Sequence, residues 1–173
     1  MQNEPVLGGA LEEPAVNESG DHSVGDRIRS LVSAQPFAVL CTQGEGQPYG
    51  SVVGFAFTRS LRSFVFATPT ATRKYRLLSE CDQVALVVDS RGSYSGDLME
   101  VEAVTVTGRA QQVEDGQQFE EYARLLVERH PYLASFIDSP STALFPVDTV
   151  RFLHVMRFQE VCQWIPTPDG SCP

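Results

Sequence analysis

Apolar residues recur at two different spacings along this chain, and the change between them predicts its secondary structure. Residues 23–35 carry apolar side chains at helical spacing, behind a serine and an acidic residue placed as in a capping box, and Pro36 ends the run. From Phe37 onward the apolar residues alternate with polar ones or form short continuous runs, as in strands. The pattern therefore predicts one N-terminal helix followed by a region built mainly of strands.

Short connections between the extended segments predict how the strands pair. These segments cover residues 37–42, 49–57, 63–67, 84–88, 99–113, 143–145, 149–155 and 158–165. Helical spacing recurs at residues 70–80, 117–128 and 130–137. Turns of a few residues join antiparallel strands, whereas a parallel sheet needs a helix between most of its strands. We expect a mostly β fold with flanking helices, in which six or seven strands form a closed antiparallel barrel.

The length and the composition indicate one folded domain with extensions at both ends. A chain of 173 residues suits a single domain with its own core. Residues 1–22 are rich in Glu, Gly, Pro and Asn and lack periodic apolar positions, which is typical of a disordered segment. We expect an acidic disordered leader at residues 1–22, the folded domain at residues 23–165 and a short tail at residues 166–173.

The charge of the chain excludes some classes of partner. The formal net charge is -9, and the first 25 residues hold five acidic residues and no Lys or Arg, so the rest of the chain carries -9 minus -5, or -4. A protein that binds nucleic acid needs a basic face, which this balance does not favour. No apolar run approaches the roughly 20 residues of a membrane span. The first residues lack a basic region followed by an apolar core, so we expect no secretory signal.

Cysteines and histidines are scattered along the chain. The four cysteines form no CxxC pair, and none of the three histidines is near a cysteine or in a metal-ligand spacing. We therefore expect reduced thiols, a cytoplasmic protein and no metal site.

One cationic segment stands out in this acidic chain. Residues 70–79 read Thr-Ala-Thr-Arg-Lys-Tyr-Arg-Leu-Leu-Ser, with Thr70 or Thr72 near the cap of a predicted helix. The start of a helix offers free N–H groups and a positive dipole end, and Arg73 and Lys74 add two cations in the same turn. Arginine binds two phosphate oxygens through its planar fork, and lysine adds a point charge. This combination indicates a phosphate site, and the alternative is a solvated pair on a surface helix.

A second candidate element is the strand at residues 49–57. Gly50 and Gly54 weaken a strand that is otherwise β-branched and aromatic, and such glycines mark close approach by a ligand or another backbone, a bulge or a tight bend. A flavin ring, one ligand of this kind, needs hydrogen bonds at its pyrimidine edge, and backbone groups of neighbouring strands around Gly50, Ser51 and Val52 can supply them. The hydroxyl of Thr68 can reach a phosphate or ribityl oxygen, or it can close the turn before a proline.

In their order along the chain, these segments resemble the pyridoxamine 5'-phosphate oxidase-related family of FMN-binding split barrels. The likeness rests on residues 37–67, on Thr-Ala-Thr-Arg-Lys-Tyr-Arg with the strand at 84–89, and on Val-Thr-Val-Thr-Gly-Arg-Ala at 104–110. It extends over residues 26–164 and leaves out the acidic leader.

The resemblance implies a homodimer that binds two FMN molecules at the subunit interface. In the family an Arg-Lys pair binds the FMN phosphate, which corresponds to Arg73 and Lys74, and the hydroxyl before the pair corresponds to Thr72. The residues at the strand end correspond to Ala67 and Thr68, and the strand beside the isoalloxazine ring to Gly50–Val53. Residues of the second subunit complete the pocket, and we look for them among Gln111, Gln112 and Trp164.

The chain also departs from the true oxidase. That enzyme has an Arg-x-His near its C-terminus that grips the substrate, whereas this chain reads Gln163-Trp-Ile-Pro-Thr-Pro-Asp there. The resemblance therefore implies an FMN-dependent oxidoreductase that transfers hydride between flavin and a small molecule or reduced nicotinamide, without assigning the substrate. Because the flavin carries the redox chemistry, no catalytic side chain is predicted.

Other functions remain open at the level of sequence. The same barrel can store or sense FMN or haem without turnover, with His130 and His154 as the candidate axial ligands in the folded part. A deazaflavin can replace FMN. A barrel without cofactor that acts through protein contacts is the third interpretation.

Overall fold

The computed structural model describes residues 21–93, 96–156 and 160–166. The helices are α1 (Asp21–Ala34), α2 (Arg73–Glu80), α3 (Gln117–Arg129) and α4 (Ala134–Ile137), with the 3-10 turns η1 (Arg91–Ser93), η2 (Leu98–Glu100) and η3 (Pro131–Leu133). The strands are β1 (Phe37–Gly44), β2 (Gln47–Phe57), β3 (Ser63–Pro69), β4 (Gln83–Asp89), β5 (Ala103–Ala110), β6 (Thr142–Met156) and β7 (Glu160–Trp164). The predicted leader at residues 1–22 lies outside the described residues except for Asp21 and His22, and so does the predicted tail after Pro166.

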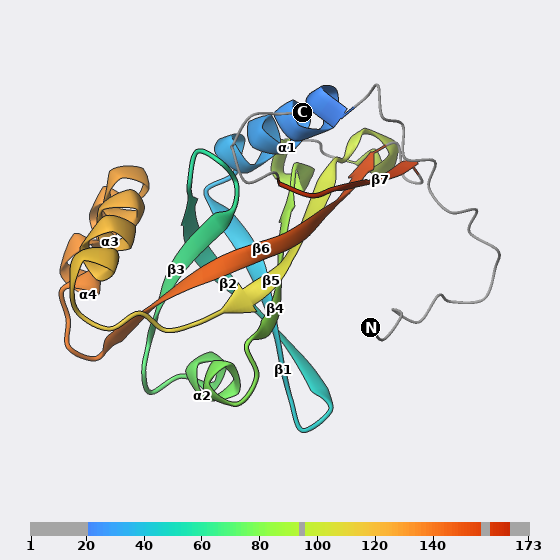
Figure 1. Cartoon of the computed structure of the whole chain (residues 1–173). Coiled ribbons are helices and arrows are strands. Elements are labelled where there is room, and N and C mark those ends of the chain that lie inside the picture. Colours follow the sequence, from blue (N-terminus) through green and yellow to red (C-terminus); the bar gives the residue numbers. More distant parts are fainter. Residues whose placement is uncertain (1–20, 94–95, 157–159, 167–173) are drawn as a thin grey trace.

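The strands form a closed antiparallel barrel, as the short connections predicted. The sheet order is β3-β2-β1-β4-β5-β6-β7, and the further pairing of β3 with β6 closes six strands into a barrel, with β7 as an extra strand on β6. One helix follows β3 and two follow β5, in agreement with the sequence. Figure 1 shows α1 above the barrel, α2 below it, and α3 with α4 to one side.

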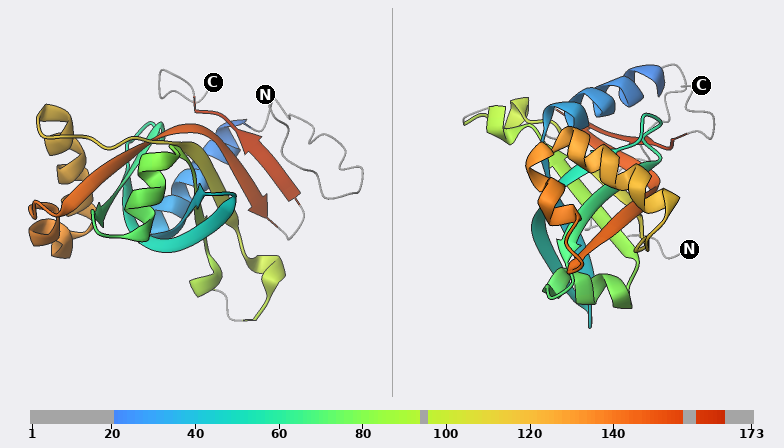
Figure 2. Two further views of the ribbon diagram at one scale, coloured as in Figure 1. Left: turned by 90° about the horizontal axis from the view of Figure 1, so that it is seen from below. Right: turned by 90° about the vertical axis from the view of Figure 1, so that its left-hand side faces the viewer.

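Two apolar clusters hold this arrangement together. The larger one fills the barrel with the inward side chains of the strands, and α1 adds Ile28, Leu31 and Val32 to it at one end. The smaller one lies on the outside of the barrel, where α3 and α4 cover Ala56 and Leu144. Seen from below in Figure 2, α2 lies across the other opening of the barrel.

The barrel is split along one seam. The ladder between β2 and β3 covers only Phe55–Phe57 and Phe64–Phe66, and beyond Phe66 the strand β3 pairs with β6 alone. Residues 47–54 of β2 pair with β1 on one side and have no strand pairing with β3 on the other. The backbone edge of β2 next to α2 is therefore open.

A bulge in β6 explains a glycine of the resembling segment. Thr107 of β5 pairs with Arg151 and Gly108 pairs with Thr149, so Val150 is the extra residue of β6. An added Cβ at Gly108 would collide with the carbonyl oxygen of Asp148. Only glycine permits this close approach of two backbones.

Two parts of the predicted strand pattern differ from the observed one. The strand predicted at residues 99–113 covers only Ala103–Ala110, and it begins late because Asp97 caps the turn η2 through a 2.9 Å bond from Met99 N to its Oδ1. The segments predicted at 143–145 and 149–155 form one strand, β6. The predicted start of the last strand at Phe158 lies outside the described residues, and β7 is described from Glu160. None of the helices in the described part of the chain has the length and apolar run that a membrane-spanning helix needs.

Candidate functional site

The first turn of α2 is held in place by two threonines. Thr72 is the N-cap, and its Oγ1 accepts a 3.3 Å hydrogen bond from Tyr75 N. The same hydroxyl donates to the carbonyl of Pro69 at 2.9 Å, and the buried Thr68 Oγ1 lies 3.0 Å from it. The prediction of a threonine cap at this helix is confirmed. Both hydroxyls bond within the turn that ends β3 and begins α2.

The cations and free amides gather at this helix start. Among the described residues, the backbone N–H groups of Arg73 and Lys74 have no hydrogen-bond acceptor. No ion pair within the described part of the chain involves either side chain. Lys74 is half-buried, and this desolvation lowers the pKa of its ammonium group. Two free donors, two unpaired cations and a positive dipole end form an arrangement that suits an anion.

The open edge of β2 faces the same helix. The guanidinium carbon of Arg73 lies 5.1 Å from the centre of the Tyr49 ring, so the start of α2 is adjacent to β2. Gly50 and Val52 point to the outside of the barrel, where Val52 is 68% exposed, and Val53 points inward. The half-buried Ser51 has a hydroxyl without a partner in the described residues. The structure thus brings the phosphate candidates and Gly50–Val53 to the two sides of the split in the barrel.

The two glycines of β2 have different surroundings. At Gly50 an added Cβ would meet only Val39 Cγ1 at 3.6 Å, which is ordinary contact, so the strand is open there. At Gly54 the His130 ring lies over the strand, 3.5 Å from the position of an added Cβ. The close approach predicted for Gly54 is therefore made by a side chain of this chain, not by a ligand or a backbone.

Four predicted site residues lie apart from this seam. The side chain of Ala67 packs in the outer cluster under α3, while its backbone pairs with Leu144. Gln111 and Gln112 are exposed beyond β5, where Gln111 N bonds to the carbonyl of Pro146. Trp164 is 5% exposed and packs on Phe152 with 5.1 Å between ring centroids. The tryptophan ring therefore belongs to the core of its own barrel.

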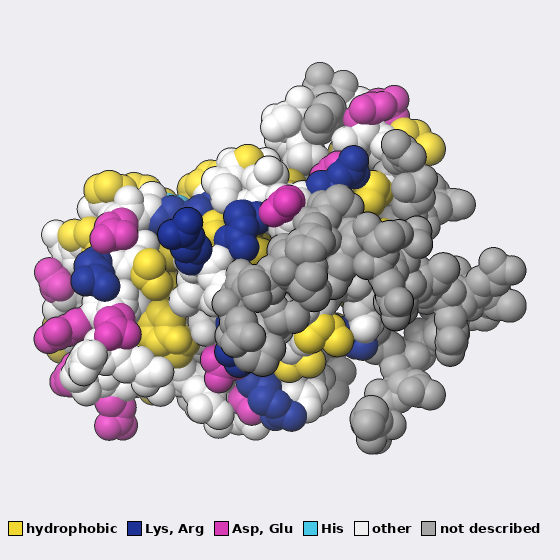
Figure 3. Space-filling view, turned by 45° about the horizontal axis from the view of Figure 1, so that its top comes forward, with side chains coloured by type: hydrophobic (Ala, Val, Ile, Leu, Met, Phe, Trp, Pro, Cys, Tyr) yellow, Lys and Arg dark blue, Asp and Glu magenta, His cyan; other side chains and the backbone are white. Residues whose placement is uncertain are grey.

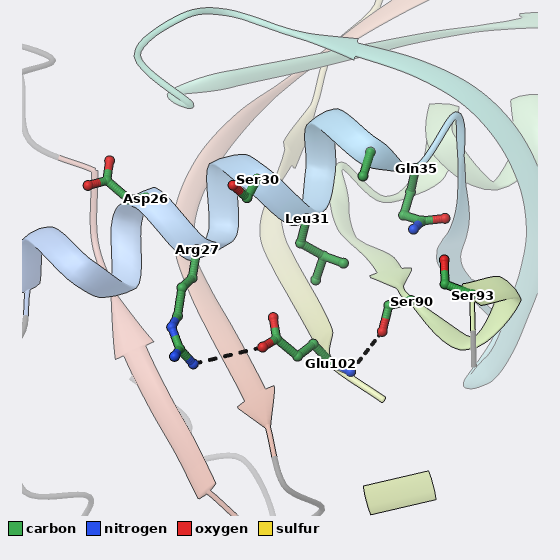
Figure 4. A pocket seen from close by; sticks show the side chains of 9 residues that line it. Asp26, Arg27, Ser30, Leu31, Gln35, Ser90, Ser93 and Glu102 are labelled. Carbon is green, nitrogen blue, oxygen red and sulfur yellow. Dashed lines mark hydrogen bonds and ion pairs between the residues drawn. The ribbon is translucent and has the colours of Figure 1, made fainter. Parts of the chain in front are cut away.

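A cavity between α1 and the connection of β4 to β5 was missed by the sequence reasoning. Its volume is about 530 Å³. Arg27 points from α1 toward Glu102, with 3.8 Å between Nη1 and Oε1, and Glu102 N bonds to Ser90 Oγ at 2.9 Å (Figure 4). Glu102 precedes β5, and its Oε2 lies 3.4 Å from His154 Nε2.

The surface charge is unevenly distributed on the face shown in Figure 3. Acidic side chains lie over α3, and Lys and Arg side chains gather beside α1 and the turn between β2 and β3. There the guanidinium of Arg29 donates to the carbonyl of Arg59, which ties α1 to this turn. This basic group is distinct from Arg73 and Lys74, which lie at the opposite end of β3.

A comparison with protein families decides the classification. A family model described as pyridoxamine 5'-phosphate oxidase matches residues 24–160. The chain belongs to this family. The match includes Arg73, Lys74 and the open edge of β2, and it confirms the resemblance inferred from the sequence. No functionally curated protein matches the chain.

Solved structures of the family's fold match at low sequence identity. A haem-binding protein from Mycobacterium smegmatis superposes with a TM-score of 0.72 at 16% identity, over 80% of this chain and 56% of that one. A Clostridium acetobutylicum protein related to general stress protein 26, of the pyridoxinephosphate oxidase family, gives 0.66 at 16% identity, over 84% and 96%. The haem storage protein HutZ from Vibrio cholerae gives 0.64 at 17%, over 72% and 88%. At these identities the likeness shows the fold alone, and this chain spans little more than half of the Mycobacterium protein.

Because two of these neighbours are haem proteins, the surroundings of the candidate axial ligands His130 and His154 need to be described. His130 is 2% exposed, with Nε2 2.9 Å from the carbonyl oxygen of Phe55 and Nδ1 3.2 Å from Tyr132 Oη. His154 is fully buried, and its Nε2 lies 3.4 Å from Glu102 Oε2. Neither ring offers a nitrogen at the surface of the described part of this family member.

Proposed function

We propose that this chain binds FMN in the split of its barrel, with the phosphate at the start of α2. The proposal rests on two neighbouring features. Arg73 and Lys74 provide free backbone amides and unpaired cations, and β2 has an open backbone edge. The Tyr49 ring of β2 contacts Arg73 and so joins the two features. The residues present fit the group. The phosphate dianion would meet N–H donors and positive charge at the start of α2. The pyrimidine edge of the flavin would meet the open backbone edge of β2 at Gly50–Val53.

The proposed activity is that of an oxidoreductase acting on a small organic molecule or a reduced nicotinamide. When bound, FMN supplies the hydride acceptor and donor itself. Arg73 and Lys74 hold its phosphate, and the backbone of β2 orients its ring. The sequence lacks the Arg-x-His of the true oxidase, so vitamin B6 oxidation is not part of the proposal. A cytoplasmic location, with the described cysteines as free thiols, belongs to the same proposal.

A homodimer is the proposed assembly. The outward side chains of β1, β2 and β4 form an apolar surface that includes Val39, Cys41, Val52 and Val87. A hollow of about 210 Å³ lies on it, lined by Phe37, Val39, Val52 and Val87 among others. An exposed apolar face of this kind is typical of an interaction surface. Because Gly50 and Val52 belong to it, a second copy seated there would lie beside the proposed ring site.

Titration of the purified protein with FMN tests the proposal. We expect a tightly held flavin with a shifted absorption spectrum, and an affinity at least about a hundredfold lower for the double variant Arg73→Ala, Lys74→Ala. Charge-assisted hydrogen bonds contribute on the order of 1.5–3 kcal/mol each, which supports a loss of that size. Arg76→Ala removes an exposed cation one turn further along α2 and serves as the control, with a change of less than about threefold. Unchanged affinity in the double variant would reject the phosphate site.

Catalysis is tested separately from binding. NADH or NADPH added under anaerobic conditions is expected to bleach the flavin absorption near the oxidised maximum. A protein that binds FMN but is bleached by no donor would support storage or sensing instead of turnover.

Haem binding is the second candidate, favoured by the haem-binding proteins among the structural neighbours. The burial of His130 and His154 argues against an axial ligand from either ring. A Soret band that appears on haem addition and is displaced by FMN would place both ligands in one site, whereas haem binding without competition would assign it elsewhere.

A further inference from the structure

Tyr49 joins the two halves of the proposed flavin site. It lies on β2 next to Gly50, and its ring faces the guanidinium of Arg73 on α2 with 5.1 Å between guanidinium carbon and ring centre. We propose that Tyr49 is a positioning residue that holds Arg73 at the split of the barrel and thereby determines the preference for a phosphorylated over an unphosphorylated flavin. This inference rests on the function proposed above.

The contact between the strand and the helix is built into the fold. The hairpin of β1 and β2 packs under α2, where an added Cβ at Gly44 would collide with Leu77 Cδ2. Thr42, opposite Tyr49 in the register, donates a 3.3 Å hydrogen bond from Oγ1 to the Tyr49 carbonyl oxygen. The backbone of Tyr49 is therefore held on one side and the helix on the other, so the ring and the guanidinium meet between two fixed elements.

Arg129 also lies over aromatic rings, and its hydrogen bonds differ from those of Arg73. Arg129 lies 4.9 Å from the ring centres of both Phe55 and Phe57, and its Nη2 donates to the carbonyls of Val32 and Gln35. Its Nη2 donors are therefore used within the protein, whereas its buried Nε has no partner among the described residues. Arg73 lies over a ring at a similar distance, yet no hydrogen bond or ion pair within the described residues involves its guanidinium. Its donors are left for a ligand.

The chemistry of the stack suits a phosphate. An aromatic face attracts a guanidinium through its quadrupole without neutralising the charge, whereas a carboxylate would compete with the ligand. The guanidinium carbon lies over the ring, and the N–H donors, which have no acceptor among the described residues, remain available for two phosphate oxygens. Because Tyr49 holds the Arg73 guanidinium in place before the ligand binds, less side-chain entropy is lost on binding.

Affinities for FMN and for riboflavin separate this role from simple packing, because only FMN carries the phosphate. For Tyr49→Leu we expect FMN affinity to fall about two- to fivefold, the range of an exposed cation–π contact. Riboflavin affinity is expected to change by less than about twofold. Tyr49→Phe keeps the ring, should restore the ratio and serves as the matched control.

A double-mutant cycle with Arg73 gives the sharpest result. In an Arg73→Ala background, Tyr49→Leu should cause no further loss of FMN affinity. Should Tyr49→Leu prove unstable, Arg73→Lys at the exposed helix start keeps the charge and removes the planar fork, and FMN affinity should fall in that variant too.

The outcomes that overturn the inference differ from those that overturn the proposed function. Equal losses for FMN and riboflavin in Tyr49→Leu, a loss that persists without Arg73, or full FMN affinity in Arg73→Lys would reject the role of Tyr49 while FMN binding stands. A wild-type protein that binds FMN no more tightly than riboflavin, or binds neither, would reject the phosphate site and this inference with it.

Discussion

At the scale of single residues, the buried His154 carries a consequence for stability. Its ring is fully buried on β6, with Nε2 3.4 Å from Glu102 Oε2 and no partner for Nδ1 in the described part of the chain. Desolvation lowers the pKa of the His154 imidazole, while the negative charge of Glu102 opposes the shift and the nearby Arg27 adds to it. The folded protein therefore holds this ring neutral at pH values where the unfolded chain begins to bind a proton.

This shift predicts a loss of stability on acidification. The unfolded imidazole takes up its proton near the ordinary value of 6.5, whereas the folded one does so only at lower pH. The free energy of unfolding should therefore fall as the pH drops below about 6.5, with a slope of at most about 1.4 kcal/mol per pH unit for one group. Urea unfolding at about pH 7.5, 6.5 and 5.5 measures the slope.

The variant His154→Gln provides the comparison for that slope. Glutamine does not titrate, so the stability of the variant should depend less on pH over the same window, even if its stability at pH near 7 is lower. An identical slope in both proteins would show that other groups cause the acid sensitivity.

At the scale of elements, one arginine ties two helices together. Arg129 ends α3, and its guanidinium donates to carbonyls at the C-terminus of α1, including that of Gln35 at 2.7 Å. The last carbonyls of a helix have no partners within the helix, and a cation at that end also complements the dipole. Burial lowers the pKa of this guanidinium. The contact joins the helix over one barrel opening to the helix on its side.

Removing this contact should destabilise the whole domain. We expect Arg129→Leu to lower the free energy of unfolding by about 2 kcal/mol, because charge-assisted bonds are lost and helix carbonyls remain without partners. Arg129→Lys should lose about half as much, since it keeps the charge without the planar fork. Chemical unfolding followed by circular dichroism measures both.

Arg124 on the same helix is the control. It is exposed and pairs with Glu128 one turn away at 3.9 Å. Arg124→Leu should change stability by less than about 0.5 kcal/mol. A comparable loss in both arginine variants would mean that α3 is sensitive to any such change, and that the contact with α1 has no special weight.

At the scale of the whole molecule, the proposed dimer puts the exposed apolar face of β1, β2 and β4 between two copies. Val52 is 68% exposed at its centre and lies two residues from Gly50. We expect Val52→Lys to convert the dimer into a monomer and to lower FMN affinity at the same time, since a buried unpaired charge costs several kcal/mol. Light scattering coupled to size-exclusion chromatography gives the mass.

The exposed Val150, on β6, allows a matched change elsewhere. Val150→Lys should leave the mass and the FMN affinity as they are in the unmodified protein. A wild-type chain that is monomeric at all concentrations, with FMN bound, would contradict the dimer and leave the site intact.

The local features of this protein could be predicted from the sequence because they depend on neighbours in the chain. Alternation and short turns predicted an antiparallel barrel, and Thr70 or Thr72 was expected near the cap of the helix at residues 70–80, where the structure has Thr72. Where a local competitor was overlooked, prediction failed. Asp97 bonds to Met99 N and holds a turn where alternation alone indicated a strand.

Only the tertiary structure decided which residues far apart in the chain contact one another. The pairing of β3 with β6 closes the barrel and leaves the edge of β2 open, and no local pattern indicates which strand β3 will choose. The contacts of His130 with Gly54, Arg129 with α1 and Tyr49 with Arg73 arise in the same way. Spacing along the chain specifies which face a residue presents, whereas packing of the closed barrel decides what that face meets.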